Sequence, residues 1–218
     1  MSRADQLSSS VVFVCEPMDN GIVRRVDEVS HINTLRIVSA EDTIFALAPA
    51  GVYDVFSLTL AVTSQAWSMS AGVAHNLLLS GEGDLFSWGS GRFGELGLGP
   101  KNTEMESPGQ VRFQTKLTAI ASGNYHSCAI DKFGNLYGWG QNFSRQLGLY
   151  TKAQSEMSAN AVVEDLVMTP RILPFSVQNS VAAVTCGSEF TIALTKVVTI
   201  VSFLFLFHPC FIRISFCP

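Results

Sequence analysis

Two stretches of the chain decide the fold: Ser70-Ala-Gly-Val-Ala-His-Asn-Leu-Leu-Leu-Ser-Gly-Glu-Gly-Asp-Leu-Phe-Ser-Trp-Gly-Ser90 and Ala121-Ser-Gly-Asn-Tyr-His-Ser-Cys-Ala-Ile-Asp-Lys-Phe-Gly-Asn-Leu-Tyr-Gly-Trp-Gly-Gln141. A single offset of 51 residues superimposes them. The coinciding positions are Gly72 with Gly123, His75 with His126, Gly83 with Gly134, Trp88 with Trp139, Gly89 with Gly140, and Leu96-Gly-Leu98 with Leu147-Gly-Leu149. A register kept without a gap over this length indicates a structural repeat.

A third, incomplete copy begins at Val184-Thr-Cys-Gly-Ser-Glu-Phe-Thr-Ile-Ala-Leu-Thr195. Gly187 follows Gly123 by 64 residues, so the second copy is 13 residues longer than the first. Most of the extra residues fall in the polar stretch Tyr150–Thr169, which we expect to form a long surface loop. Pro108 and Pro170 are expected just before the next strand of each copy.

Each copy has the composition of short antiparallel strands. Leu77–Ser80 is an apolar run of buried-strand length, and Leu85–Trp88 mixes aliphatic and aromatic residues between glycines. The segments between such runs, Gly81–Asp84 and Lys132–Asn135, are predicted hairpin turns. Thirteen of the 17 glycines lie within residues 81–148, which favours tight turns with positive φ. Short strands repeated about every 50 residues are typical of a β-propeller blade.

Residues 1–65 lack the repeated His, Trp-Gly and Leu-Gly-Leu elements. Thr43–Leu47 followed by Gly51–Tyr53 could be a degenerate copy of the same hairpin. Upstream, four apolar residues are spaced for one face of a helix: Ile22, Val26, Val29 and Ile32. This segment is therefore predicted to be divergent, with either a degenerate blade or a helix in it.

The composition excludes several classes of protein. Hydrophobic residues make up 47% of the chain and charged residues only 15%, which excludes a disordered, solvated chain. The net charge of −4 gives no broad cationic field, so direct nucleic-acid binding is not expected. The five cysteines form no Cys-x-x-Cys pair, so neither a disulfide framework nor a metal site is predicted, and Cys128 and Cys186 are interpreted as small buried hydrophobes. A reducing compartment, the nucleus or the cytoplasm, fits this usage best.

The order Gly-x-x-His, then Gly-x-Leu-Phe/Tyr-x-Trp-Gly, then Leu-Gly-Leu resembles the regulator-of-chromosome-condensation repeat. The resemblance covers about residues 66–195 and implies a β-propeller, which in this family has seven blades. Seven copies would need about 360 residues, more than the 218 present. The predicted fold is therefore an all-β, partial β-propeller of about three antiparallel blades, or four if residues 1–65 contribute one. Within the family, the blades and the long insertion are most similar to those of a small member.

Residues 196–218 form a hydrophobic tail in which the repeat motif is lost. The run Val197–Phe207 is shorter than the ~20 apolar residues of a membrane helix, and the residues after it are interrupted by His208, Pro209 and Arg213. Three interpretations stay open at this point: a membrane anchor, a final pair of strands, or sequence from an alternative transcript end. A membrane partner is the least expected of these outcomes.

The repeated residues are predicted to be structural. They are Gly72, His75, Gly83, Trp88, Gly89, Gly123, His126, Gly134, Trp139, Gly140 and Gly187. A histidine at the same place in two copies is more typical of a hydrogen-bonding residue inside each blade than of a base or metal ligand, and Phe190 stands there in the third copy. Gly89-Ser-Gly-Arg-Phe-Gly94 spells a dinucleotide fingerprint, but no helix is predicted after it. No cofactor and no catalytic constellation are therefore predicted.

The loops after the two Trp-Gly turns are the candidate binding elements. Each contains a phenylalanine and an arginine, residue types enriched at interface hot spots: Arg92, Phe93, Phe143 and Arg145. The alternative is that both phenylalanines pack between blades. The favoured function is a non-enzymatic protein-interaction module, and the resemblance implies a chromatin-associated partner such as a histone demethylase. A guanine-nucleotide exchange factor for a small GTPase and a membrane-tethered propeller fragment are the alternatives.

Overall fold

The structure, a computed structural model, divides into two compact units, Met1–Ala66 and Trp67–Pro218. It describes the backbone of residues 12–15, 23–26, 36–40, 43–48, 51–54, 60–62, 66–149, 165–177, 179–196, 199–206 and 208–215. Side chains are described for residues 66–149, 165–174, 176–177 and 179–196.

The first unit contains a strand pair and a four-stranded sheet. Strands β1 (Val12–Cys15) and β2 (Val23–Val26) are antiparallel, with Val12 opposite Val26. The sheet has the order β3 (Arg36–Ala40), β4 (Thr43–Ala48), β5 (Gly51–Asp54) and β6 (Leu60–Val62). Its second and third strands match the hairpin that the sequence suggested, and Ala48 pairs with Gly51 at the turn.

The predicted helix is wrong where the structure describes it, because Val23–Val26 is a strand. Apolar spacing alone cannot detect that Val12–Cys15 is a partner strand, and valine favours the pleated conformation. Ile22, Val29 and Ile32 lie outside the described residues.

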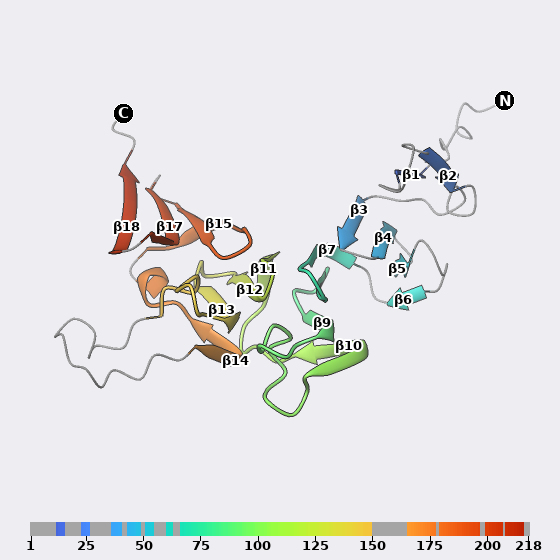
Figure 1. Ribbon diagram of the computed structural model, residues 1–218, viewed down its shortest axis with the longest axis horizontal. Coiled ribbons are helices and arrows are strands. Elements are labelled where there is room, and N and C mark those ends of the chain that lie inside the picture. Colours follow the sequence, from blue (N-terminus) through green and yellow to red (C-terminus); the bar gives the residue numbers. More distant parts are fainter. Residues whose placement is uncertain are drawn as a thin grey trace. The chain divides into compact units, whose positions relative to one another are not determined.

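The second unit contains three four-stranded sheets, each with its strands in chain order (Figure 1). The first comprises β7 (Ala66–Ala71), β8 (His75–Ser80), β9 (Leu85–Ser90) and β10 (Glu104–Val111). The second comprises β11 (Leu117–Ser122), β12 (His126–Asp131), β13 (Leu136–Gln141) and β14 (Leu166–Ile172). The third comprises β15 (Val181–Cys186), β16 (Thr191–Thr195), β17 (Thr199–Leu206) and β18 (His208–Ser215). The only helical turn among the described residues is Pro174–Val177.

The predicted hairpin turns connect the second and third strands of the first two sheets. Gly83 and Gly134 occupy them with φ of 83° and 89°, the left-handed conformation that glycine adopts without strain. Each glycine carbonyl accepts a hydrogen bond from the first strand of the following sheet, from Leu117 N at 3.0 Å and from Val181 N at 2.8 Å. The turn therefore also joins one sheet to the next.

Two expectations about the outer strands are wrong. Pro108 lies inside β10 and Pro170 inside β14 instead of before them. Both strands are fourth in their sheets, and the register of each shifts near its proline, so the missing N–H does not interrupt a central ladder. Residues 166–169, expected in the long loop, belong to β14, and residues 150–164 lie outside the described part of the chain.

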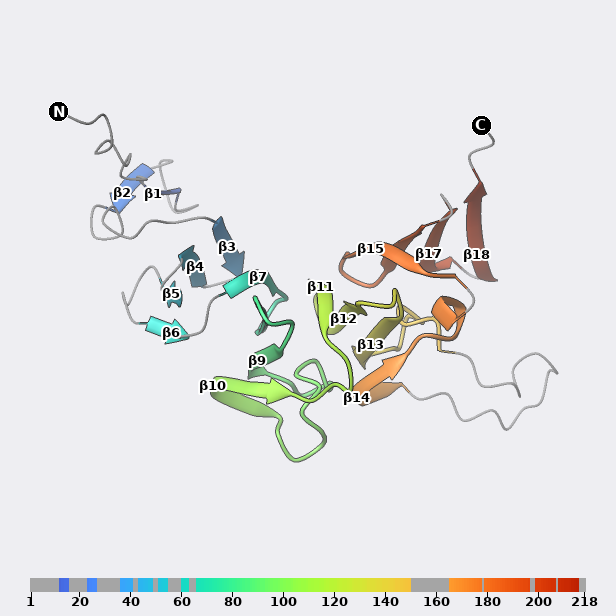
Figure 2. The same cartoon turned by 180° about the vertical axis from the view of Figure 1, so that it is seen from behind.

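The hydrophobic tail supplies the last two strands of the third sheet (Figure 2). Thr191 at the start of β16 pairs with Phe203 of β17, and β17 pairs along its whole length with β18. This backbone corresponds to the strand-pair interpretation of the tail. Among the residues described, no helix is long and apolar enough to cross a membrane.

The core of the second unit lies on the second strands of the repeat. Every residue of β8 and of β12 is buried, as a strand enclosed on both faces requires. Leu77, Ile130, Leu136 and Trp139 belong to one hydrophobic cluster that extends to Val181 of the third sheet. Neighbouring sheets thus share a continuous core.

Candidate functional site

The Gly-x-x-His motif places an imidazole directly on a glycine. His75 and His126 begin β8 and β12 and are fully buried. A Cβ atom built on Gly72 or Gly123 would overlap the ring three residues later, so the motif needs glycine at its first position. In the third sheet, the ring of Phe190 occupies the same place above Gly187. The slot therefore requires a flat ring, which in two of the three copies is an imidazole.

A buried hydrogen-bond network joins the first sheet to the second. The hydroxyl of Ser127 on β12 donates to the carbonyl of Glu95 at 2.9 Å, and Trp139 Nε1 donates to the same carbonyl at 2.7 Å. Because the hydroxyl hydrogen is used in this way, His75 Nε2–H donates to Ser127 Oγ across 2.9 Å. The loop after β9 and the start of β8 are both fixed against the neighbouring sheet.

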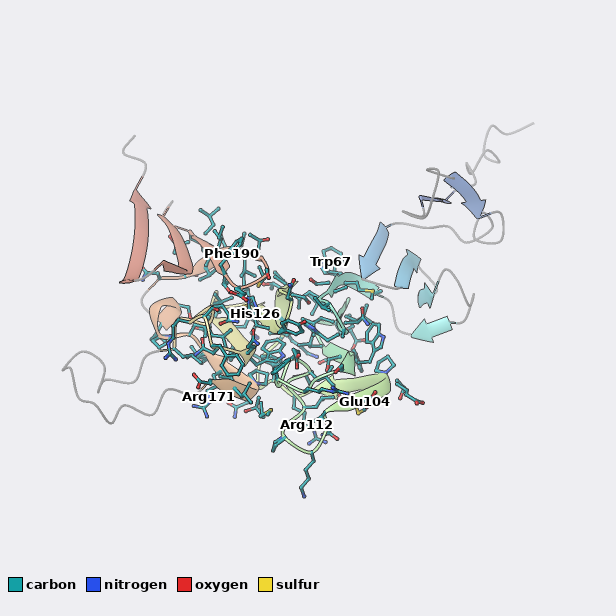
Figure 3. All side chains as sticks on the ribbon, viewed as in Figure 1. Trp67, Glu104, Arg112, His126, Arg171 and Phe190 are labelled. Atoms are coloured by element: carbon teal, nitrogen blue, oxygen red, sulfur yellow. The ribbon has the colours of Figure 1, made fainter. Side chains whose placement is uncertain are left out.

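The same contact recurs between the second and third sheets. His126 Nε2 lies 3.0 Å from Thr191 Oγ1, and Thr191 occupies the position after the motif ring, as Ser127 does one copy earlier. Figure 3 labels His126 and Phe190, the two rings on either side of this junction. A ring nitrogen of one sheet therefore faces a hydroxyl of the next at both junctions.

Burial keeps both imidazoles neutral. Loss of solvent lowers the pKa of His75 to about 3 and that of His126 to about 4, and repulsion between the two rings adds to the effect at His75. Rings with such pKa values carry no charge near neutrality. They are therefore poorly suited to accept protons as general bases at pH 7.

The Leu-Gly-Leu element packs against the tryptophan of the following sheet. Trp139 is 0% exposed, and a Cβ on Gly97 would lie 2.9 Å from its Nε1 atom. Gly97 has a φ of 68°. The tryptophan of the first sheet, Trp88, is also buried. These residues hold the loop after β9 in a fixed conformation.

The Trp-Gly turn brings the loop back to the Gly-x-x-His corner. Gly89 and Gly140 have φ of 101° and 102°, and a Cβ on either would collide with the backbone carbonyl before the histidine. Ser90 N and Gln141 N donate to those carbonyls at 2.7 and 2.8 Å. Corner and loop therefore lie together at one end of the strands, in a region that we call the rim: residues 72–74, 91–99, 123–125, 142–149 and 187–190.

Three aromatic rings meet on the rim. The Phe93 ring contacts Tyr125 edge-on with a centroid separation of 5.3 Å, and Phe143 edge-on at 6.3 Å. Phe93 is half-buried, whereas Phe143 is 52% exposed. Arg92 is exposed beside them. Phe93 thus packs between sheets, as the alternative interpretation expected, while about half of Phe143 faces solvent.

Arg145, two residues after Phe143, forms an ion pair with Asp165. Its guanidinium is 3.5 Å from the carboxylate of Asp165. The preceding residue, Ser144, donates a hydrogen bond to Glu189 of the third sheet at 3.1 Å. The structure therefore brings Phe93 and Phe143 into contact, whereas Arg145 pairs with a carboxylate of its own sheet.

Sequence reasoning missed Tyr125 and Glu189, which contact the loops of the preceding sheet. Both stand immediately before the ring of the Gly-x-x-His motif, where the first copy has Ala74. The available signal was that this position differs between the copies while the glycine two residues before it repeats. A side chain that varies on a repeated backbone is not needed for the fold and can serve binding.

The glycine-rich segment 89–94 has no dinucleotide geometry. Among the described residues no helix follows it; Gly94 opens a series of turns, with a φ of 92°. The carboxylate of Glu95 accepts the N–H of Phe93 at 2.8 Å. Burial raises the pKa of this carboxyl group. A buried carboxylate at this place would repel a pyrophosphate, so the segment serves as a structural loop.

Residues 82–130 and 134–194 match the Regulator of chromosome condensation (RCC1) repeat, and residues 117–146 match a second description of the same repeat. The chain belongs to the RCC1 repeat family. The resemblance predicted from the sequence is confirmed, and so is the all-β, partial β-propeller fold. The three sheets of the second unit are its blades.

Three comparisons illustrate the likeness. RCC1 domain-containing protein 1 of Mus musculus is 28% identical over 166 residues, which are 65% of this chain and 44% of that protein. The Probable E3 ubiquitin-protein ligase HERC3 of Homo sapiens is 34% identical over 130 residues, 59% of this chain and 11% of that protein. Prp20p from Saccharomyces cerevisiae, studied with its binding properties to Gsp1p and histones, superimposes with a TM-score of 0.64 at 18% identity, covering 83% of this chain and 47% of that one. The chain therefore spans less than half the length of these proteins.

Proposed function

We propose that this RCC1-repeat chain is a non-enzymatic protein-interaction module that binds a chromatin-associated protein through its rim. The contact residues in this proposal are Arg92, Phe93, Phe143 and Arg145, together with Tyr125. The partner class is a chromatin factor such as a histone demethylase, and the site of action is the nucleus or the cytoplasm.

Phe143 is the observation that carries the proposal. Half of a large apolar ring is exposed on a turn, where a solvent-facing phenylalanine contributes nothing to the core. Its other side contacts Phe93, which in turn contacts Tyr125 of the second blade. A ring held in this way loses little conformational entropy on binding, which is the property of an interface hot spot.

The scaffold beneath the rim supports the same conclusion. Buried hydrogen bonds between neighbouring blades hold the loops in place. Binding residues commonly lie on loops that a rigid scaffold positions. The imidazoles of this network are neutral and the carbonyl of Glu95 is saturated by two donors, so these groups serve structure and leave binding to the exposed side chains.

Likeness to family members supports the partner class. Prp20p is described with its binding to Gsp1p and histones, and RCC1 domain-containing protein 1 of Mus musculus is 28% identical over 65% of this chain. Most of the HERC3 sequence lies outside the matched region, so its ligase activity gives no reason to expect catalysis here.

The experiment compares captured chromatin proteins between two phenylalanine variants of the full chain. Phe143→Ser removes the exposed rim ring. Phe133→Ser is the matched control, because Phe133 is 65% exposed but lies on the hairpin turn at the opposite end of β12 and β13. We expect quantitative mass spectrometry of nuclear-extract eluates to show a chromatin protein that Phe143→Ser loses by about tenfold or more and Phe133→Ser retains.

Equal capture by both variants would contradict a rim interface. A second assay addresses exchange activity: nucleotide release from a panel of purified small GTPases with the full chain at catalytic amounts. No acceleration is expected. Acceleration that Phe143→Ser abolishes would replace the proposed role by that of an exchange factor.

A further inference from the structure

An imidazole and two thiols meet in the buried junction between the second and third blades. His126 and Cys128 are two residues apart on β12, so they lie on the same face of that strand. Cys186 at the end of β15 is the cross-strand partner of Thr191 at the start of β16. One nitrogen and two sulfur atoms from His126, Cys128 and Cys186 all lie within 4.8 Å of one another.

The Thr191 hydroxyl completes a set of four donor atoms. Its Oγ1 atom is 3.0 Å from His126 Nε2 and 3.9 Å from the Sγ atom of each cysteine. Neighbouring ligands around a tetrahedral zinc ion, with bonds of about 2.3 Å to sulfur and about 2.0 Å to nitrogen, are about 3.3–3.8 Å apart. The distances from Thr191 Oγ1 to the two sulfur atoms are therefore close to this range. The nitrogen and the two sulfur atoms, all within 4.8 Å of one another, need to move together by at most about 1 Å to hold such an ion.

The repeat itself does not require these thiols. At the equivalent junction between the first and second blades, the positions of Cys128 and Cys186 are occupied by Leu77 and Ser122. That junction keeps its histidine and its hydroxyl without any sulfur atom. Two cysteines facing one another beside a histidine are thus a property of the second junction, beyond what blade packing demands.

We propose that this junction is a closed zinc site, in which His126 Nε2, Cys128 Sγ and Cys186 Sγ are the ligands and the Thr191 hydroxyl is the fourth. Binding replaces the two thiol protons by one Zn²⁺ ion, releases both protons to solvent and changes no oxidation state. Two thiolates cancel the charge of the ion, which a buried site requires. The bound ion would connect β12 to β15 and β16.

Cobalt(II) substitution tests the site directly. The full chain, reduced and stripped of metal with a chelator, is titrated with Co²⁺, which reports tetrahedral thiolate ligation through strong visible bands and a sulfur-to-metal absorption in the near ultraviolet. We expect saturation at one equivalent, displacement of Co²⁺ by Zn²⁺, and a higher melting temperature of the zinc-loaded chain.

Variants taken from the chain's own first junction supply the controls. Cys186→Ser and Cys128→Leu introduce the residue types that stand at the equivalent positions there, and each should weaken binding by roughly tenfold or more. Because Cys128→Leu enlarges a buried side chain, circular dichroism is used to check that this variant folds. If the Cys128→Leu variant unfolds, the Cys186→Ser variant alone tests the site. A chain with Cys15, Cys210 and Cys217 replaced by serine should bind as the parent does.

The opposite results would overturn the proposal. Absence of the tetrahedral spectrum, or binding that survives Cys186→Ser but disappears in the triple serine variant, would place any metal elsewhere. A disulfide between Cys128 and Cys186 in the chain isolated without reductant, with no metal bound after its reduction, would equally exclude the zinc site.

Discussion

Acidification should destabilise the chain, and burial of His75 contributes a defined part of that loss. The ordinary histidine pKa of 6.5 falls to about 3 in the folded chain, chiefly because the ring is buried. Between these values the unfolded chain binds a proton that the folded chain excludes, so stability is complete above pH 6.5 and is lost as the pH falls toward 3. At about 1.4 kcal/mol per pH unit, the loss from this one residue at pH 5 is about 2 kcal/mol.

His75→Phe isolates that contribution. The third blade shows that the slot accepts phenylalanine, because Phe190 stands above Gly187 as His75 stands above Gly72. The variant loses the hydrogen bond to Ser127, which lowers stability at every pH alike. The difference between pH 7 and pH 5 should therefore be about 2 kcal/mol smaller in the variant than in the parent.

Urea unfolding followed by far-ultraviolet circular dichroism measures this difference. With a slope of about 2 kcal/mol per molar urea, the parent midpoint should fall by about 1 M more than the variant midpoint between the two pH values. An equal fall in both proteins would mean that the ring exchanges protons with solvent in the folded state, and would refute the claim that the blade junction excludes water from it.

Three further substitutions test the local geometry. Gly123→Ala should lower the free energy of unfolding by about 1–3 kcal/mol in thermal melts, since its Cβ overlaps the ring of His126; an unchanged melting temperature would contradict this packing. Arg145→Gly should raise the free energy of unfolding by about 0.5–1 kcal/mol in urea titrations, because the arginine has a φ of 59°. A lower free energy of unfolding would show that the ion pair with Asp165 outweighs the backbone strain. Burial raises the pKa of Glu95 in the folded chain, so the free energy of unfolding should decline as the pH rises from the ordinary pKa through the raised one. Glu95→Gln should remove this decline. Its readout is the urea midpoint of parent and variant at pH 4.5, the ordinary pKa of the carboxyl group, and at pH 7. An amide fits this position, because Gln146 occupies it in the second blade and accepts the N–H of Ser144 there. A parent midpoint that does not fall relative to the variant midpoint would refute the effect.

The sequence was sufficient to predict the blades because their signals are local. Glycines in turns and apolar runs of strand length are local features, and the 51-residue offset shows that the same local features recur. The strands and turns of the first two blades lie where these features fall. The strand at Val23–Val26 was missed because a strand is defined by its partner, and apolar spacing carries no information about Val12–Cys15.

The rim and the junctions were only partly predictable for the same reason. Phe93 and Phe143 were identified by residue type, but their contact depends on how two loops from neighbouring blades meet. The approach of Cys128 to Cys186 depends on β12 packing against β15, which no spacing within either strand encodes. Pro108 and Pro170 were expected before a strand and lie inside one, because proline is tolerated in an outermost strand and position within a sheet is a tertiary property.

The bond between Trp139 Nε1 and the carbonyl of Glu95 has a consequence for how the polypeptide can be divided. The loop after β9 in the first blade covers the indole of the second blade, so neither of the two parts separated at the β10–β11 connection contains all the groups that its interior needs. Two peptides produced by cleavage in the connection between β10 and β11 would each carry an unsatisfied surface that only the other can cover. Such fragments should recombine on mixing and recover the tryptophan environment, as in fragment complementation.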